Sequence, residues 1–155
     1  MLEYLFCTWY DTYMNKTFEL TTPKDVTHGR GYVYSLQYHI VWCTKYRKQV
    51  LKDGIDDRVK QLLTDMQWEY SFRILAMEVM PDHIHLLLDC KPQFFISDMI
   101  KIFKGNIARR LFLEYPELKK QLWGGHLWNP SYFVVTVSER SREQVEAYIE
   151  TQEEK

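Results

Sequence analysis

The sequence predicts a single α+β domain, and its order of elements is the main reason. Segments with strand-like alternation and segments with helix-like spacing follow one another as strand, helix, strand, strand, helix, strand, helix. Apolar residues make up 46% of the 155 residues, enough for a proper core. A βαββαβ order closes into an antiparallel sheet with helices on one face, the ferredoxin-like or RRM-like arrangement. The extra C-terminal helix is then free to cover the other face.

The N-terminal segment differs from the rest of the chain. Residues 1–13 are crowded with aromatic side chains without a regular period, and a polar stretch containing Pro23 follows. We interpret residues 1–28 as an N-terminal arm or an overlong start, with Met14 as an alternative initiator. Residues 29–155 then form the domain.

The first strand is predicted over residues 32–43. Tyr38, Ile40 and Trp42 share an apolar face, as a core-facing strand requires. His39 lies on the more polar face, where a structural or solvated role is the default. A helix is expected next, over residues 55–69, because apolar residues recur there with helical spacing. They are Ile55, Val59, Leu62, Leu63 and Met66.

A basic cluster lies between that strand and that helix. Lys45, Arg47 and Lys48 surround one aromatic residue, Tyr46. Such a cluster can hold phosphates, and the ring is available to stack on a base. A short charge run is as well explained by a solvated loop, so both interpretations stay open.

Two histidines begin the second strand of a predicted hairpin. Residues 72–80 form its first strand, Pro81 and Asp82 form a tight turn, and the second strand starts at His83. Side chains alternate along a strand, so His83 and His85 project from the same face. Two imidazoles fixed side by side supply half of a metal site. The alternative is the solvated face of a half-buried strand.

A second helix is predicted over residues 96–114, and Pro116 ends it. Its buried stripe consists of Ile96, Ile100, Phe103, Ile107 and Leu111. Four cations lie at the edges of the stripe or away from it, with no acid among them: Lys101, Lys104, Arg109 and Arg110. They are candidates for contact with a nucleic-acid backbone, and an ordinary solvated face is the alternative. A further strand is expected over residues 131–138.

The last helix begins at a capping box, Ser141 to Gln144. Tyr148 and Gln152 lie one turn apart on its polar stripe. If this helix covers the face that holds His83 and His85, two imidazoles and the amide oxygen of Gln152 provide three ligands. A mixed nitrogen and oxygen site with open positions suits Mg²⁺ or Mn²⁺ better than a closed zinc site.

Composition excludes some classes of protein. The formal net charge of −1 gives no overall attraction to nucleic acid, so binding of a polyanion depends on local basic patches. The three cysteines, Cys7, Cys43 and Cys90, suggest neither a disulfide framework nor a zinc knuckle. No apolar run approaches the roughly 18 residues needed to span a membrane. We therefore expect a soluble, cytoplasmic protein.

Several motifs together resemble one family. The segment from Pro81 to Leu87 resembles the histidine-hydrophobe-histidine motif of HUH enzymes. Residues 148–152 resemble the nucleophile helix of their single-tyrosine transposases. Residues 29–34, 42–47 and 123–132 are also similar to segments of TnpA-type transposases, which move insertion sequences of the two-hundred/six-hundred-and-five family. The resemblance runs from about residue 29 to residue 152.

The resemblance implies a transposase. It would be a homodimeric, metal-dependent strand transferase and endonuclease that cleaves and rejoins single-stranded DNA at insertion-sequence ends marked by hairpins. Tyr148 would be the nucleophile that forms a 5′-phosphotyrosine, and His83, His85 and Gln152 would bind Mg²⁺ or Mn²⁺. The basic residues Lys45, Arg47, Lys48, Lys101, Lys104 and Arg109 would contact DNA. The arm at residues 1–28 departs from the family pattern.

Two alternatives remain at this point. A ferredoxin-like sheet with aromatic residues can also bind single-stranded nucleic acid without catalysis. That alternative explains the basic residues but gives no reason for two histidines, Tyr148 and Gln152 together. The other alternative is a relative of the transposases retained by its host, which the sequence does not distinguish from an enzyme of a mobile element.

Overall fold

The structure, a computed structural model, describes residues 27–137. Its elements are β1 (Thr27–Gly29), β2 (Tyr32–Tyr34), β3 (Gln37–Cys43), η2 (Lys45–Arg47), α2 (Ile55–Tyr70), β4 (Arg73–Met80), β5 (His83–Asp89), α3 (Ile96–Glu114), α4 (Leu118–Gln121), η3 (Trp123–Gly125) and β6 (Phe133–Val137). The predicted arm lies almost wholly outside the described residues. The predicted last helix, with Tyr148 and Gln152, also lies outside them.

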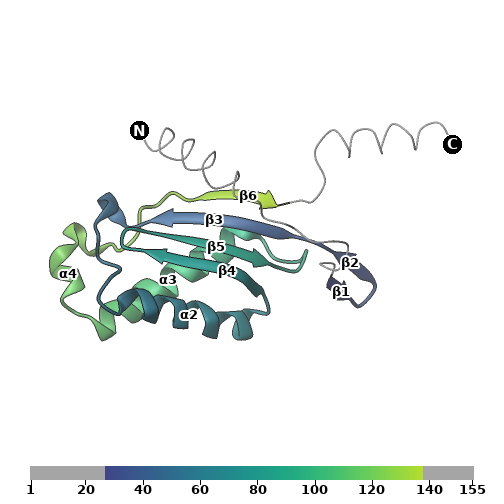
Figure 1. Cartoon of the computed structure of the whole chain (residues 1–155), viewed down its shortest axis with the longest axis horizontal. Helices are drawn as coiled ribbons and strands as arrows, with labels where there is room; N and C mark the ends of the chain where they lie inside the picture. The colour runs from purple at the N-terminus through teal and green to yellow at the C-terminus, as the bar shows by residue number, and fades with distance from the viewer. Residues whose placement is uncertain (1–26, 138–155) are drawn as a thin grey trace.

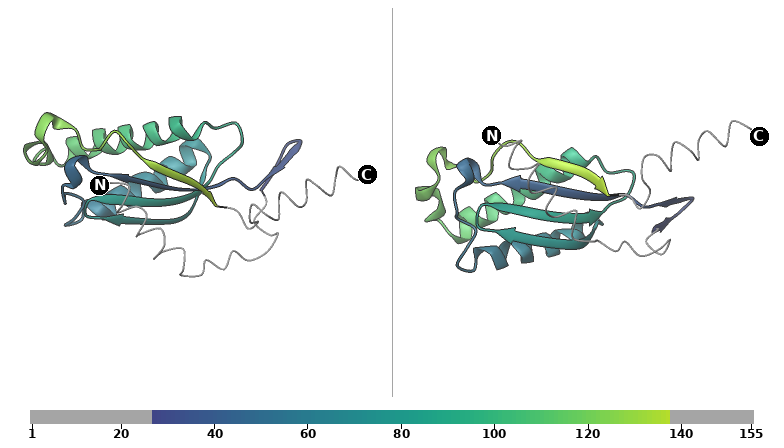
Figure 2. Two further views of the ribbon diagram at one scale, coloured as in Figure 1. Left: turned by 90° about the horizontal axis from the view of Figure 1, so that it is seen from above. Right: turned by 45° about the horizontal axis from the view of Figure 1, so that its top comes forward.

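Strands β3 to β6 form one antiparallel sheet in the order β4-β5-β3-β6. With α2 and α3 inserted between them, they give the predicted βαββαβ order, so the predicted fold class is confirmed. Helices α2 and α3 lie on the same side of the sheet (Figures 1 and 2). None of the helices within residues 27–137 is long and apolar enough to cross a membrane.

The core lies between the sheet and the two helices. Helix α3 has the predicted bounds, and Ile100, Phe103, Ile107 and Leu111 of its stripe are buried. The Phe103 ring packs against Trp42 of β3, with centroids 6.5 Å apart, and against Phe72, with centroids 5.0 Å apart. Burying such a side chain contributes about 1.5–3 kcal/mol, so these contacts hold the helix against β3 and against the segment between α2 and β4.

The predicted strand over residues 32–43 is wrong in one respect, because two strands occupy this span. β2 pairs with β1 in a separate hairpin, and the chain leaves strand geometry at Ser35 and Leu36 before β3 begins. Gly31 turns the hairpin with a φ of 86°, a value that favours glycine. The hairpin projects beyond the end of the main sheet (Figure 1), and Thr27 Oγ1 donates a hydrogen bond of 2.9 Å to Asp89 Oδ2.

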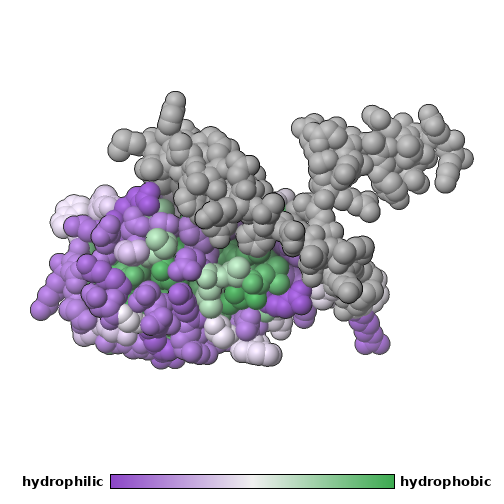
Figure 3. Space-filling view, viewed as in Figure 1, coloured by the Kyte–Doolittle hydropathy of each residue, from purple (hydrophilic) through white to green (hydrophobic). Residues whose placement is uncertain are grey.

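The sheet face opposite the helices carries the histidines. Cys43 pairs with His83, Val41 with His85, and His39 with Leu87, so all six side chains share that face. Figure 3 views the molecule from this side and shows hydrophobic surface over the sheet, bordered by hydrophilic surface. The residues on this face, together with the loops that join it, form the candidate site.

Candidate active site

The histidine pair lies on β5, which is hydrogen-bonded to a neighbouring strand on both sides. The rings of His83 and His85 project from one face, as predicted, with centroids 4.8 Å apart and planes at 87°. A central strand places both imidazoles in a fixed relation to each other, because its backbone cannot shift without breaking two ladders of hydrogen bonds. The pair therefore forms a rigid set of nitrogen donors.

Asp82 and Arg47 hold the first histidine. Asp82 Oδ1 lies 2.5 Å from His83 Nδ1, and Arg47 Nε donates a hydrogen bond of 2.9 Å to Asp82 Oδ2. Burial raises the pKa of Asp82, but hydrogen bonds from His83 and Arg47 outweigh it and leave the pKa below its ordinary value. An ionised carboxylate accepts a proton donor, so this network assigns the proton to His83 Nδ1. Nε2 then keeps its lone pair for a metal.

A third histidine lies against the pair. The ring of His39 stacks on that of His85, with centroids 5.6 Å apart and planes at 26°. Burial, together with nearby His83 and His39, lowers the pKa of His85 from its ordinary value to about 3. Burial also lowers the pKa of His39. His85 is therefore neutral at neutral pH, the form in which an imidazole binds a metal. The alternation of side chains along β3 predicts that His39 lies on this face. That His39 lies next to His85 follows only from the register between β3 and β5, which the sequence does not show.

The described residues fit part of a metal site. Within residues 27–137, no group of three or more histidine, cysteine, aspartate or glutamate residues could hold a metal ion. His83 and His85 supply two imidazole nitrogen donors, and Asp82 makes the hydrogen bond that commonly orients such a ligand. These donors fit a divalent metal whose remaining ligands come from elsewhere. The predicted third ligand, Gln152, lies outside the described residues.

The basic loop after β3, which contains Lys45, Arg47 and Lys48, is hydrogen-bonded to the turn that precedes the histidine strand β5. Thr44 N–H donates to the carbonyl oxygen of Asp82 at 2.9 Å, and Thr44 Oγ1 donates to that of Lys48 at 2.7 Å. Within this frame, Tyr46 and Arg47 both have left-handed backbones, with φ of 55° and 51°. Each such residue costs about 1–2 kcal/mol relative to the right-handed form. With this backbone conformation, the Arg47 guanidinium contacts Asp82.

A family model described as "Transposase IS200 like" matches residues 32–152 of this chain. The matched span includes the histidine pair, the basic loop and both α-helices that cover the sheet. It covers well over half of the sequence.

This chain belongs to the IS200-like transposase family.

Similar proteins support this assignment. The chain is 52% identical over 133 residues to the ISDra2 transposase TnpA of Deinococcus radiodurans, covering 86% of this chain and 95% of that protein. It is 30% identical over 130 residues to the transposase for insertion sequence element IS200 of Salmonella typhimurium, covering 83% and 82%. A crystal structure of a transposase from Deinococcus radiodurans R1 matches with a TM-score of 0.68 and 52% identity, covering 81% and 97%. The family suggested by the motifs is confirmed.

The predicted DNA contacts of this transposase fall into two groups. Lys45, Arg47 and Lys48 lie in the loop that joins the histidine strand. Lys101 and Arg109 lie on α3, on the other side of the sheet, where they contact Asp98 and Asn106 at 3.4 and 3.1 Å. The structure therefore brings only the first group close to the histidine pair.

Lys104 has a different environment from the other predicted DNA contacts. Its ammonium group donates to the carbonyl oxygens of Asn129, Pro130 and Ser131, at 2.8, 3.3 and 2.9 Å. The Trp128 indole N–H donates to the Lys104 carbonyl at 2.9 Å. These bonds clamp the loop before β6 onto α3. Three carbonyl acceptors therefore hold this cation against the loop, and DNA contact by Lys104, as by the other basic residues, stays a prediction.

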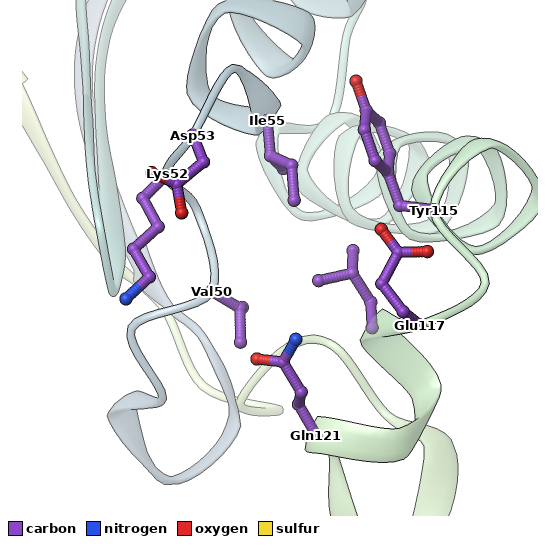
Figure 4. Close-up of a pocket in the computed structure, with 8 residues that line it drawn as sticks. Val50, Lys52, Asp53, Ile55, Tyr115, Glu117 and Gln121 are labelled. Atoms are coloured by element: carbon purple, nitrogen blue, oxygen red, sulfur yellow. The ribbon is translucent and has the colours of Figure 1, made fainter.

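A pocket of about 220 Å³ lies apart from the histidine pair. Figure 4 shows Lys52, Asp53 and Ile55 on one side of it and Tyr115, Glu117 and Gln121 on the other. None of the predicted site residues lines it. Its mixture of one cation and two carboxylates does not favour a polyanion, so we do not assign it to DNA.

Proposed function

We propose that this transposase cleaves and rejoins single-stranded DNA through Tyr148, with His83, His85 and Gln152 holding a divalent metal. The observation that most favours this proposal is the chain of contacts from Arg47 through Asp82 to His83. A purely binding surface has no need for a carboxylate that fixes the proton on one imidazole nitrogen. A metal ligand does need it.

The proposed step is a transesterification. The Tyr148 phenol gives up its proton as its oxygen attacks a DNA phosphorus atom, and the bond from phosphorus to the 3′ oxygen breaks. The bonding electrons leave with that oxygen, which takes a proton to become a free 3′-hydroxyl, while the tyrosine retains the 5′-phosphate. A bound divalent ion would withdraw charge from the phosphate and stabilise the transition state. One phosphoester replaces another, so the step can be reversed onto a different DNA end without ATP.

The proposed partners are a single DNA strand and a second copy of the chain. The family resemblance implies hairpin-marked ends and a homodimer. Lys45 and Lys48, in the loop that joins the histidine strand, are suited to hold phosphates near the reacting bond. Lys101 and Arg109 lie across the sheet and would contact a more distant part of the DNA.

The test is the formation of a covalent adduct. Full-length protein, Mg²⁺ and labelled single-stranded DNA carrying a candidate element end should give a protein–DNA species that survives denaturant. The Tyr148→Phe and His83→Ala variants should not form it. Tyr132→Phe serves as the matched control, because Tyr132 lies beside β6, is partly exposed and should be dispensable. An adduct that persists in Tyr148→Phe, or that disappears in Tyr132→Phe, would refute the assignment of the nucleophile.

A further inference from the structure

Tyr46 combines a strained backbone with an exposed ring. Its φ of 55° and ψ of 22° lie in the left-handed region, which aromatic residues rarely adopt, and 63% of the residue is exposed. Strained residues persist where the surrounding structure offsets the cost, and they cluster at functional sites. An exposed ring buries little apolar surface, so its packing does not offset this strain.

The backbone of the loop does not need an aromatic side chain at this position. Its contacts are made by Thr44, by the Lys45 N–H to the Leu127 carbonyl at 2.8 Å, and by the Arg47 N–H to the Thr44 carbonyl at 3.0 Å. Glycine would adopt the same φ without strain and keep these backbone bonds. The presence of a tyrosine ring therefore has a reason outside the folding of the loop.

The surroundings of the ring indicate what that reason is. The next residue, Arg47, reaches Asp82 and through it His83. The Lys45 ammonium lies over the ring, 5.5 Å from its centroid, and Lys48 is exposed nearby. An exposed aromatic ring among cations is the pattern of sites that bind single-stranded nucleic acid, where the ring stacks on a base and the cations hold phosphates.

We propose that Tyr46 is a stacking site for one base of single-stranded DNA, next to the phosphate held at the histidine pair. The inference rests on the proposed function, since it places the base relative to the reacting phosphate. The two adjacent residues with left-handed backbones, Tyr46 and Arg47, then have two separate roles. One side chain binds the base, and the other orients a metal ligand through Asp82.

The test separates stacking from folding by using glycine. The full-length Tyr46→Gly variant should unfold at the same temperature as the wild type or at a higher one, because the strain is relieved. Its affinity for a short, fluorescently labelled single strand, measured by anisotropy in the presence of a chelator, should fall about tenfold or more. Tyr46→Phe should bind like the wild type, because phenylalanine keeps the stacking face.

Two control variants match the two features of Tyr46. Trp68 of α2 is an aromatic residue that is 80% exposed on the helical side of the sheet, so Trp68→Ala should leave the affinity unchanged. Ser71 has the same φ of 55° without an aromatic ring. Ser71→Gly should therefore preserve or raise the unfolding temperature without changing the affinity.

Photo-crosslinking locates the contact directly. A single strand that carries 5-iodouracil should crosslink to the peptide containing Tyr46, again without metal. The proposal is overturned if Tyr46→Gly binds like the wild type, or if crosslinks map only to other aromatic residues. Neither measurement requires cleavage. A crosslink at Tyr46 in a protein that forms no Tyr148 adduct would keep the stacking site and refute the enzymatic function.

Discussion

Replacing Asp82 by asparagine should weaken the binding of Mn²⁺ at the histidine pair by about 10- to 100-fold. In the wild type, the carboxylate accepts from His83 Nδ1 at 2.5 Å and from Arg47 Nε at 2.9 Å. Asparagine preserves the size of the side chain but removes its charge. The proton on His83 is then no longer held at Nδ1, and Nε2 is less often available as a ligand.

The expected magnitude follows from the contacts. A change of 10- to 100-fold in affinity corresponds to about 1.4–2.7 kcal/mol, which is the range for a hydrogen bond to a charged group. The turn itself should survive, because it is held by backbone atoms. The Thr44 N–H donates to the Asp82 carbonyl, and the Leu51 N–H donates to the Pro81 carbonyl, both at 2.9 Å.

The assay combines calorimetry with a spectroscopic signature. Titration of full-length protein with Mn²⁺ gives the affinity, and ¹⁵N NMR of the imidazole rings in the metal-free protein reports which nitrogen carries the proton. The wild type should show His83 protonated at Nδ1. The Asp82→Asn variant should show a mixture of tautomers, even where its fold is unchanged.

A double-mutant cycle tests the order of the contacts. Arg47 should act through Asp82, so Arg47→Ala should weaken metal binding less than Asp82→Asn, and the double variant should be no weaker than Asp82→Asn alone. The reasoning is refuted if Asp82→Asn binds Mn²⁺ as tightly as the wild type does. It is also refuted if the two losses simply add, because Arg47 would then act on the metal independently.

Three further predictions concern stability. Phe103→Ala should lower the free energy of unfolding by about 3–5 kcal/mol, because the Phe103 ring is fully buried against Trp42; a loss well below this in thermal unfolding would mean that the core closes over the cavity. Lys104→Met should cost about 1–2 kcal/mol in urea unfolding through the lost bonds to three carbonyls, and an unchanged midpoint would show that water replaces them. Burial and nearby His83 and His39 depress the pKa of His85 from 6.5 to about 3. As the pH falls, the unfolded state therefore takes up this proton before the folded state does, and the free energy of unfolding decreases from pH 6.5 down to about pH 3. His85→Gln should lose less stability over that window, and an equal acid slope in both proteins would contradict the prediction.

Local periodicity predicted the elements well where the core side chains recur regularly. Helix α3 begins and ends at the predicted residues, because its apolar stripe runs unbroken from Ile96 and Pro116 stops it. The same reasoning missed the break at Ser35 and Leu36. Apolar and polar side chains keep alternating through these two residues, so the pattern does not show that the strand ends there. It also does not show that β2 pairs with β1. The four-residue helix α4 is too short to show a period.

Contacts between distant segments could not be predicted. The alternation of β5 placed His83 and His85 on one face, which the structure shows. Arg47 lies 35 residues from Asp82 in the chain, and neither charge indicates the other. The sequence therefore suggested Arg47 as a phosphate contact, which stays a prediction, but gave no sign that its guanidinium contacts a carboxylate. The three acceptors of Lys104 could not be foreseen for the same reason, because they lie in a loop about 25 residues away.

The position of β5 inside the sheet has a consequence for how the site meets its ligands. Its backbone amides are bonded to β3 on one side and β4 on the other, so they should exchange with solvent only when the whole domain opens. The two imidazoles therefore keep their arrangement for as long as the domain stays folded. Under the proposed function, an incoming ion would find these two donors already in place, and little conformational entropy would be lost in gathering them. Local unfolding at the edges of the domain should therefore leave the positions of His83 and His85 unchanged.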